Sequence, residues 1–287
     1  MIEYPQHSQL SDEYIIGKIA DFLAEDLPEG DKTTEGIITE SVTISAEFQA
    51  GEGLVFAGEK ILPYCFGENC QTTLNHNDGD ILSIGDVIGV VMGSAREILS
   101  RERVMLNLIQ RLCGIATLTR KYAEIANPFN VKILDTRKTT PGLRLFEKYA
   151  VAVGGGYNHR LNLSDGILIK DNHIIASSSV TKAIKSVRKA GAGLPLEIEV
   201  DNTNQIREAL EANVDGFLLD NMNPQTIKES VSLIRASENG NDIFVEASGG
   251  ITLENIRPYL ETGIDAISIG ALTHQAVSKD IRLNFIT

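Results

Sequence analysis

The sequence predicts an α/β protein: an incomplete parallel β/α barrel with a smaller N-terminal α+β sandwich domain. Three observations support this prediction. Six short apolar runs recur every 20–35 residues in the second half of the chain, separated by segments of helical periodicity. Nearly every run ends in a charged or small polar residue. The first half instead alternates apolar and polar residues between turns marked by glycine.

The smaller domain is assigned to residues 1–112 and to the tail 278–287. A first helix is predicted at about residues 11–25, and the alternating segments 42–58 and 81–93 predict strands. The tail alternates in the same way. We therefore expect it to return to the N-terminal sheet as an edge strand.

A long helix, or two helices in line, is predicted from about residue 96 to residue 125. Apolar residues recur there at helical spacing. This segment bridges the two halves of the chain, and residues 113–277 are assigned to the barrel domain.

The barrel domain is predicted from strands that are apolar almost throughout, which is typical of a parallel sheet covered by helices. Between them, Asn223 and Thr252 fit helix N-caps, with Pro224 at a first helical position. Gly191 and Gly263 fit helix C-caps. The predicted strands are VKILDT (131–136), GILIK (166–170), LEIEV (196–200), GFLLD (216–220), IFVEAS (243–248) and AISIG (266–270).

The polar residues at the strand ends favour a closed barrel over an open, doubly wound sheet. In a β/α barrel the carboxyl ends of the strands converge on one mouth, where such enzymes carry out their chemistry. An open sheet would spread the same positions along a line. The barrel is therefore preferred, and the open sheet is the alternative.

The charge of the chain is unevenly distributed. The formal net charge is −13, yet residues 101–170 contain 12 Lys and Arg against 5 Asp and Glu. An acidic protein with one basic block can concentrate positive potential on a small anionic ligand. A chance cluster of solvated cations is the other interpretation of this block.

The composition argues against several classes of protein. The acidic balance argues against nucleic acid as a partner. No apolar run approaches the roughly 18 residues needed to cross a bilayer, so no membrane association is expected. The polar, acidic first residues do not fit a signal peptide. Three cysteines, Cys65, Cys70 and Cys113, lack disulfide or zinc spacing, which indicates reduced thiols in a cytoplasmic protein.

Two motifs supply cations. Arg137 and Lys138 follow the first barrel strand, where a guanidinium can bind a carboxylate or phosphate through two hydrogen bonds and an ammonium adds a point charge. His159 and Arg160 follow the triple glycine at 154–156, which allows backbone to approach a ligand closely. Exposed surface cations are the alternative reading of both motifs.

Lys170 closes the second barrel strand, where it can meet an anion or act as a nucleophile, as in a Schiff-base aldolase. The third and fourth strands supply acids. Glu197, Glu199 and Asp201 alternate along one strand and so share one side, with Glu199 and Asp201 near its end, and Asp220 closes the next strand. These oxygens could hold Mg²⁺ or stabilise a developing positive charge. Salt bridges to neighbouring strands would also explain them.

Small residues follow the last two strands. Ser248, Gly249 and Gly250 end one strand, and Gly270 ends the other. In a β/α barrel, small residues in these loops, each opening a helix, form a phosphate-binding cradle.

The chain resembles the quinolinate phosphoribosyltransferase family (nicotinate-nucleotide pyrophosphorylase, carboxylating) over essentially its whole length. The segments that carry this resemblance are, in order, ERVMLNLIQRLCGIAT, KILDTRKTTPGLR, GGGYNHRLNLSDGILIKDNH, EIEVDN, LLDNM and EASGGITLENI.

This resemblance implies an N-terminal sandwich domain, an incomplete barrel and a homodimer whose active sites take residues from both subunits. It also implies roles for the matching residues. Arg137, His159, Arg160 and Lys170 would line the quinolinate pocket, which Arg103 would reach from the partner subunit. The remaining site residues would bind phosphoribosyl pyrophosphate: Lys138, Glu199 and Asp220 beside the pyrophosphate and Mg²⁺, and Ser248, Gly249, Gly250 and Gly270 around the 5′-phosphate.

The implied reaction transfers phosphoribosyl to quinolinate with decarboxylation, giving nicotinate mononucleotide, pyrophosphate and CO₂ for NAD biosynthesis. A Schiff-base lyase would explain Lys170 and the glycine loops, but it does not explain why Arg137 and Arg160 are present. A ligand-binding sensor on the same fold is a further rival. A sister family linked to molybdenum transport has Phe where this chain has Thr140, and lacks the KDNH motif of 170–173.

Overall fold

The computed structural model describes residues 2–191 and 193–286. Two compact units make up the chain, and neither is contiguous. The barrel unit contains Lys121–Thr139, Gly156–Ala271 and the N-terminal residues up to Gln6. The sandwich unit contains His7–Arg120, Thr140–Gly155 and the chain from Leu272 onward. Met1 and Thr287, both assigned from the sequence to the smaller domain, lie outside the described residues.

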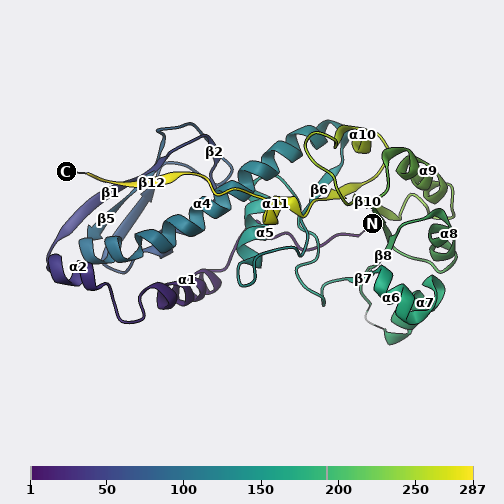
Figure 1. Ribbon diagram of the computed structural model, residues 1–287, viewed down its shortest axis with the longest axis horizontal. Coiled ribbons are helices and arrows are strands. Elements are labelled where there is room, and N and C mark those ends of the chain that lie inside the picture. Colours follow the sequence, from purple (N-terminus) through teal and green to yellow (C-terminus); the bar gives the residue numbers. More distant parts are fainter. Residues whose placement is uncertain (1, 192, 287) are drawn as a thin grey trace. The chain divides into compact units, whose positions relative to one another are not determined.

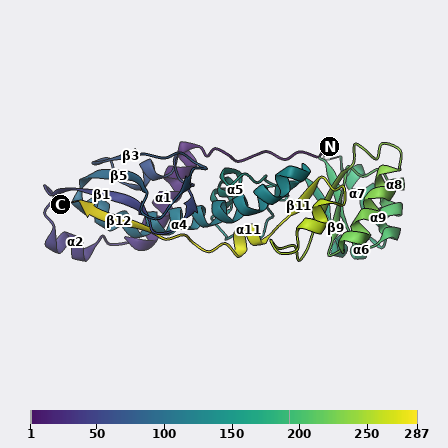
Figure 2. The same cartoon turned by 90° about the horizontal axis from the view of Figure 1, so that it is seen from above.

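The sandwich unit is built on an antiparallel sheet of four strands in the order β12-β1-β5-β3, with a separate pair β2-β4. The C-terminal tail forms β12, which pairs with β1 from Ser45–Ile286 to Ala50–Ile281; Figure 2 shows the two strands side by side. The strand bounds are β1 (Thr43–Ala50), β2 (Leu54–Val55), β3 (Cys70–Leu74), β4 (Ile81–Leu82), β5 (Val87–Ser94) and β12 (Ile281–Ile286).

Two predicted helices form close to their expected bounds. Ser11 caps α1, its hydroxyl accepting the Tyr14 N–H at 3.3 Å. The long helix α4 is continuous over 32 residues and passes from the sandwich unit into the barrel unit after Arg120. The helices are α1 (Asp12–Asp26), α2 (Lys32–Ile37), α3 (Leu62–Cys65), α4 (Ala95–Ala126), α5 (Arg144–Val153) and α11 (Ala271–His274).

All six predicted barrel strands form, and they make one parallel sheet in the order β6-β11-β10-β9-β8-β7. The first strand pairs with the last, as in a ring, and in the described residues no ladder joins β6 to β7. The sequence prediction of an incomplete barrel is thereby confirmed. The strands are β6 (Lys132–Leu134), β7 (Ile167–Ile169), β8 (Leu196–Val200), β9 (Gly216–Asp220), β10 (Phe244–Ser248) and β11 (Ala266–Ser268).

The curvature of this sheet is visible in its interior. Side chains from β8 and β10, which are alternate strands, approach His159 so closely that their ligand atoms lie within 4.8 Å of one another. Alternate strands of a flat sheet would be about 9.5 Å apart. Inward-pointing residues from alternate strands meet in this way when a sheet curls into a barrel.

Helices cover the outside of the strands, and Figure 1 shows α7, α8 and α9 on the outer side of the sheet. Two of the predicted helix ends are capped by the residues expected from the sequence. Asn223 caps α9 ahead of Pro224, and Gly191 ends α7 in the left-handed conformation with φ of 72°. The elements are η1 (Asn127–Phe129), α6 (Asp171–Ser177), α7 (Val180–Ala190), α8 (Thr203–Glu211), α9 (Pro224–Arg235) and α10 (Arg257–Leu260).

The helix expected after Thr252 is much shorter than predicted. Turns occupy the residues after Thr252, α10 begins at Arg257, and it ends at Leu260, before Gly263. Pro258 explains the later start: without an N–H to donate it fits the first turn of a helix but not the interior, so the helix begins beside it instead of at Thr252. The predictions of Thr252 as N-cap and Gly263 as C-cap of that helix were therefore wrong.

The N-terminal arm, residues 2–6, lies at the amino ends of the barrel strands. Ile2 and Tyr4 are buried in a cluster with Leu134, Phe244 and Ala266. At the start of β9 the arm runs so close that a Cβ on Gly216 would lie 2.7 Å from Ile2 Cδ1. The arm therefore closes the end of the barrel opposite the carboxyl ends of the strands.

Candidate active site

The predicted site residues of the barrel unit gather at the carboxyl ends of its strands. Because these strands are parallel, their carboxyl ends lie at one edge of the sheet. The residues are Arg137 and Lys138 after β6, His159 and Arg160 in the segment that runs beside the end of β6, Lys170 after β7, Glu199 in β8, Asp220 in β9, Ser248, Gly249 and Gly250 from β10, and Gly270 after β11.

Arg137 and Lys138 lie on an exposed turn anchored by a buried residue. The Lys138 N–H donates to Thr136 Oγ1 at 3.0 Å. Asp135, at the end of β6, is fully buried. The turn therefore presents two exposed cations from a rigid strand end.

The same Asp135 carboxylate holds the segment that carries the next two cations. Its Oδ1 accepts the His159 N–H at 2.9 Å, and its Oδ2 accepts Nδ2 of Asn158 at 2.7 Å. The Asn158 N–H in turn donates to Gln6 Oε1 of the N-terminal arm at 2.8 Å. Both motifs are thus tied to one carboxylate.

Arg160 is buried, with 6% of its surface exposed, and its Nη1 donates to Gly166 O at 2.8 Å. Burial, followed by the nearby positive charge of Arg137, lowers the pKa of Arg160. The charges of Tyr4, Glu197 and Asp165 act in the opposite direction. Because the charge of Arg137 disfavours that of Arg160, an anion bound at these two guanidinium groups would be stabilising.

Lys170 and Glu199 form an ion pair between the ends of β7 and β8. The Lys170 side chain is 46% exposed and that of Glu199 is 14% exposed, so the pair lies at the solvent boundary. Asp220, at the end of the adjacent strand β9, accepts a hydrogen bond from Asn221 Nδ2 at 2.6 Å. Two carboxylates therefore stand at neighbouring strand ends.

The glycine loop after β10 requires glycine for two reasons. Gly249 has φ of 98°, a conformation in which other residues are strained. A Cβ there would also lie 2.2 Å from Asn221 Oδ1. The Asn221 N–H donates to Ser248 O at 2.8 Å, which joins this loop to the end of β9.

His159 directs both ring nitrogens to the protein. Its Nδ1 accepts the Arg160 N–H at 2.8 Å. Its Nε2 faces Glu197 Oε2 at 3.3 Å and Glu246 Oε2 at 3.7 Å, both carboxyl groups being fully buried. The ring stacks on Tyr4, with centroids 4.6 Å apart.

This buried cluster has the residue types of a metal site, but its hydrogen bonding argues against one. A peptide N–H is always a donor, so Nδ1 of His159 must accept and the ring proton of the neutral imidazole lies on Nε2. A protonated nitrogen cannot ligate a metal. We therefore interpret the cluster as a group of buried polar side chains that face one another and hold the His159 ring, and not as a metal site.

Arg103, the remaining predicted site residue, lies on α4 in the sandwich unit. Its side chain is 63% exposed and its Nη2 is 3.9 Å from Glu102 Oε1. A solvated cation of this kind is free of strong internal contacts and is available to a ligand or to another molecule.

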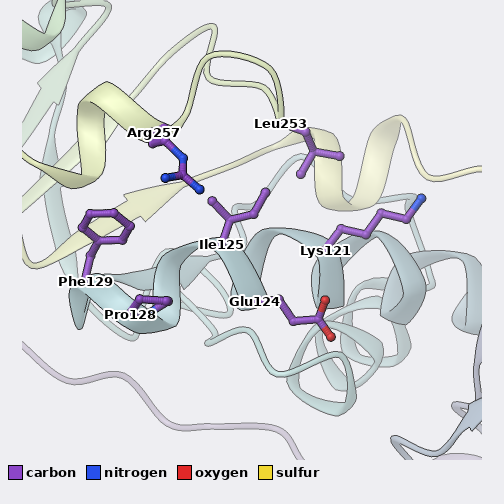
Figure 3. Close-up of a pocket in the computed structure, with 7 residues that line it drawn as sticks. All are labelled: Lys121, Glu124, Ile125, Pro128, Phe129, Leu253 and Arg257. Carbon is purple, nitrogen blue, oxygen red and sulfur yellow. The ribbon is translucent and has the colours of Figure 1, made fainter.

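A cavity of about 640 Å³ in the barrel unit lies apart from these residues. Figure 3 shows it between the end of α4, η1 and the residues leading into α10. None of the predicted site residues lines it; its lining residues are Lys121, Glu124, Ile125, Pro128, Phe129, Leu253 and Arg257. We place the active site at the strand ends, because the cations and carboxylates converge there.

Four residues that contact His159 have no role of their own in the sequence-based prediction: Tyr4, Asp135, Glu197 and Glu246. One signal for two of them was present in the sequence. Glu197 and Glu246 are charged residues in the middle of apolar strands, and a fully buried carboxyl group needs a partner. That partner, His159, lies in a different segment, so only the fold reveals it.

Comparison with known proteins agrees with this architecture. Residues 31–113 match the model of the quinolinate phosphoribosyl transferase N-terminal domain, and residues 115–284 match that of the C-terminal domain. A probable nicotinate-nucleotide pyrophosphorylase [carboxylating] from Bacillus subtilis is 46% identical over 267 residues, covering 92% of this chain and 90% of that protein. The Mycobacterium leprae enzyme of the same name is 40% identical and covers 91% and 94%.

Solved structures give the same answer. The nicotinate-nucleotide pyrophosphorylase from Francisella tularensis superimposes with a TM-score of 0.90 at 33% identity, covering 99% of this chain and 100% of that one. The agreement extends over both domains, in sequence and in fold. The chain belongs to the quinolinate phosphoribosyl transferase family.

Proposed function

We propose that this chain is a nicotinate-nucleotide diphosphorylase (carboxylating), a pentosyltransferase of NAD biosynthesis. It transfers phosphoribosyl from phosphoribosyl pyrophosphate to quinolinate and releases pyrophosphate and CO₂. The observation that carries this proposal is the paired guanidinium site of Arg137 and Arg160, together with Lys170 at the end of β7, in a chain of this family. Quinolinate has two adjacent carboxylates, and this site offers a cation to each.

The chemistry needs no protein nucleophile. The pyridine nitrogen attacks C1 of the ribosyl group while the bond from C1 to pyrophosphate breaks, and pyrophosphate leaves with the electron pair. The carboxylate beside the nitrogen then leaves as CO₂. Its bonding electrons pass to the pyridinium ring, and a proton takes its place.

The protein contributes position and charge. Arg137, Arg160 and Lys170 bind the two carboxylates and hold the nitrogen towards C1, which converts a bimolecular step into a nearly unimolecular one. Glu199 and Asp220 face the positive charge that develops on the ribosyl ring. Lys138 binds the pyrophosphate.

The glycine loop fits the 5′-phosphate. Ser248, Gly249 and Gly250 end β10 and Gly270 follows β11, which is where β/α barrels bind phosphate. The left-handed conformation of Gly249 and Gly250 keeps side chains away and allows the phosphate to approach backbone N–H groups.

The carboxylates also fit Mg²⁺, which prefers oxygen ligands. Glu199 and Asp220 stand on adjacent strands, and two carboxylates are too few to fill an octahedral shell. We therefore propose that they hold the ion together with pyrophosphate oxygens and water. Bound there, Mg²⁺ would neutralise charge on the leaving pyrophosphate.

Two further parts of the proposal concern assembly and location. We propose a homodimer in which Arg103 of the partner subunit completes the quinolinate pocket, an idea supported by the exposed position of this residue in the sandwich unit. We propose a cytoplasmic location, supported by three cysteines that are all free thiols. No described helix has both the length and the apolar character to cross a membrane.

The Schiff-base alternative is less well supported. Lys170 is ion-paired with Glu199, a contact made by an ammonium, whereas a Schiff-base lysine attacks as a neutral amine. Treatment with borohydride and a carbonyl substrate should therefore leave the protein unlabelled.

The deciding assay follows the loss of quinolinate absorbance with Mg²⁺ and phosphoribosyl pyrophosphate. Nicotinate and nicotinamide are the controls, since they have one carboxylate and none. We expect quinolinate to be used far better than nicotinate, and nicotinamide not at all. Comparable turnover of nicotinate would refute the proposal.

A further inference from the structure

Arg160 is connected to a chain of buried polar groups that begins with the side chain of His159. Its backbone N–H donates to His159 Nδ1 at 2.8 Å, so the neighbouring imidazole fixes the direction of this peptide. The imidazole proton then lies on Nε2, which faces two carboxyl groups. The orientation of Arg160 thus depends on the ring beside it.

The ring is fixed on three sides. Tyr4 stacks on its face with an interplanar angle of 26°, and the Tyr4 hydroxyl donates to Glu197 Oε2 at 3.5 Å. Glu246 Oε2 faces the same Nε2 from β10 at 3.7 Å. Glu197, Glu246 and His159 are at most 6% exposed, so water does not replace these contacts.

We propose that Glu246 is a positioning residue for the acceptor site: with Glu197 and Tyr4 it fixes the His159 ring, and through that ring it fixes Arg160. This inference rests on the proposed function, because Arg160 is assigned there to a quinolinate carboxylate. Glu246 itself is fully buried and contacts no substrate. Its effect is therefore specific for the acceptor and does not extend to the phosphoribosyl donor.

The protonation of Glu246 gives this proposal a second signature. Burial, followed by the Glu197 charge, raises the pKa of Glu246 to about 8, while His159, Ser268 and Lys170 act to lower it. Tyr4 also faces the group from the N-terminal arm. Near neutral pH the carboxyl group is therefore mainly protonated. Above about pH 8 it gains a negative charge beside Glu197 and the His159 ring, which disturbs the contacts that hold this ring in place.

The test compares Glu246→Ala, Glu246→Gln and the wild-type enzyme. We expect Glu246→Ala to raise the KM for quinolinate about tenfold, the effect of loosening one charge-assisted contact, with the KM for phosphoribosyl pyrophosphate within about twofold. Glu246→Gln keeps the shape and the neutral charge, so it should restore most of the affinity at pH 7. Glu211→Ala, on the exposed end of α8, is the control.

The pH profile separates positioning from simple stabilisation. In the wild-type enzyme the KM for quinolinate should rise between pH 7.5 and 9 as Glu246, with its pKa of about 8, ionises. The glutamine variant cannot ionise and should lack this rise. Equal changes in both KM values, or the same alkaline rise in the glutamine variant, would overturn the proposal. Wild-type turnover of quinolinate at pH 7 tests the proposed function independently of these outcomes.

Discussion

Removing the Arg111 guanidinium should destabilise the sandwich unit far more than removing a comparable surface cation. Arg111 lies on α4 and binds Glu147 of α5, with Nη2 2.8 Å and Nε 3.1 Å from Glu147 Oε1. It also donates to the carbonyl oxygens of Thr273 and Ala276 at 2.6 and 3.1 Å. Glu147 is fully buried, so no water can replace its partner.

The magnitude follows from this burial. Arg111→Ala leaves a buried carboxylate without its counter-charge, which typically costs about 3–5 kcal/mol of unfolding free energy. Arg188→Ala is the matched control. Its pair with Asp215 has nearly the same distance, 2.9 Å, but the side chains are 42% and 44% exposed. An exposed pair contributes about 0–1 kcal/mol.

Urea unfolding followed by circular dichroism measures both values, since the chain has no tryptophan to report by fluorescence. A double variant, Arg111→Met with Glu147→Leu, should recover most of the loss because it removes both charges. If Arg111→Ala cost no more than Arg188→Ala, the reasoning from burial would be wrong.

Three further predictions test the proposed site. Arg103→Ala and Lys138→Ala should each be nearly inactive, and mixing them under subunit exchange should restore about a quarter of wild-type activity, because half the dimers carry one intact site. No recovery despite proven exchange would place Arg103 outside the partner's site. EDTA should abolish activity and excess Mg²⁺ or Mn²⁺ should restore it; full activity in the chelator would leave the two carboxylates another role. Gly249→Ala should raise the KM for phosphoribosyl pyrophosphate at least tenfold, because its Cβ would meet Asn221 Oδ1 at 2.2 Å. Gly17→Ala, in open space on α1, is the control for Gly249→Ala and should only stabilise the protein, by up to about 1 kcal/mol. Unchanged kinetics for Gly249→Ala would exclude a close approach at that loop.

The parts of this structure that depend on local pattern could be predicted from the sequence. All six barrel strands and the cations at their ends follow from apolar runs and the residues that close them. The helix after Thr252 is the exception: its apolar residues recur at helical spacing, but Pro258 lacks the N–H that a residue in the interior of a helix donates. Contacts across the barrel could not be predicted from local pattern. Glu197 lies close to Glu246 because β8 and β10 flank the same strand, and this strand order is known only from the fold.

The placement of the acceptor cations over a buried acidic network has a physical reason. A guanidinium withdrawn from water, as Arg160 is, loses solvation and is further disfavoured by Arg137. The nearby charge of Glu197 offsets part of this cost before any substrate is present. A carboxylate on the strand-end surface would also offset the cost of burying the Arg160 charge. It would, however, compete directly with quinolinate for the guanidinium. Setting the counter-charge on the inner side, behind His159, keeps Arg160 charged and oriented while its outer side stays available to the acceptor. This arrangement requires polar residues in the barrel core, and it explains why Tyr4, Glu197 and Glu246 occupy positions that packing alone would give to apolar side chains.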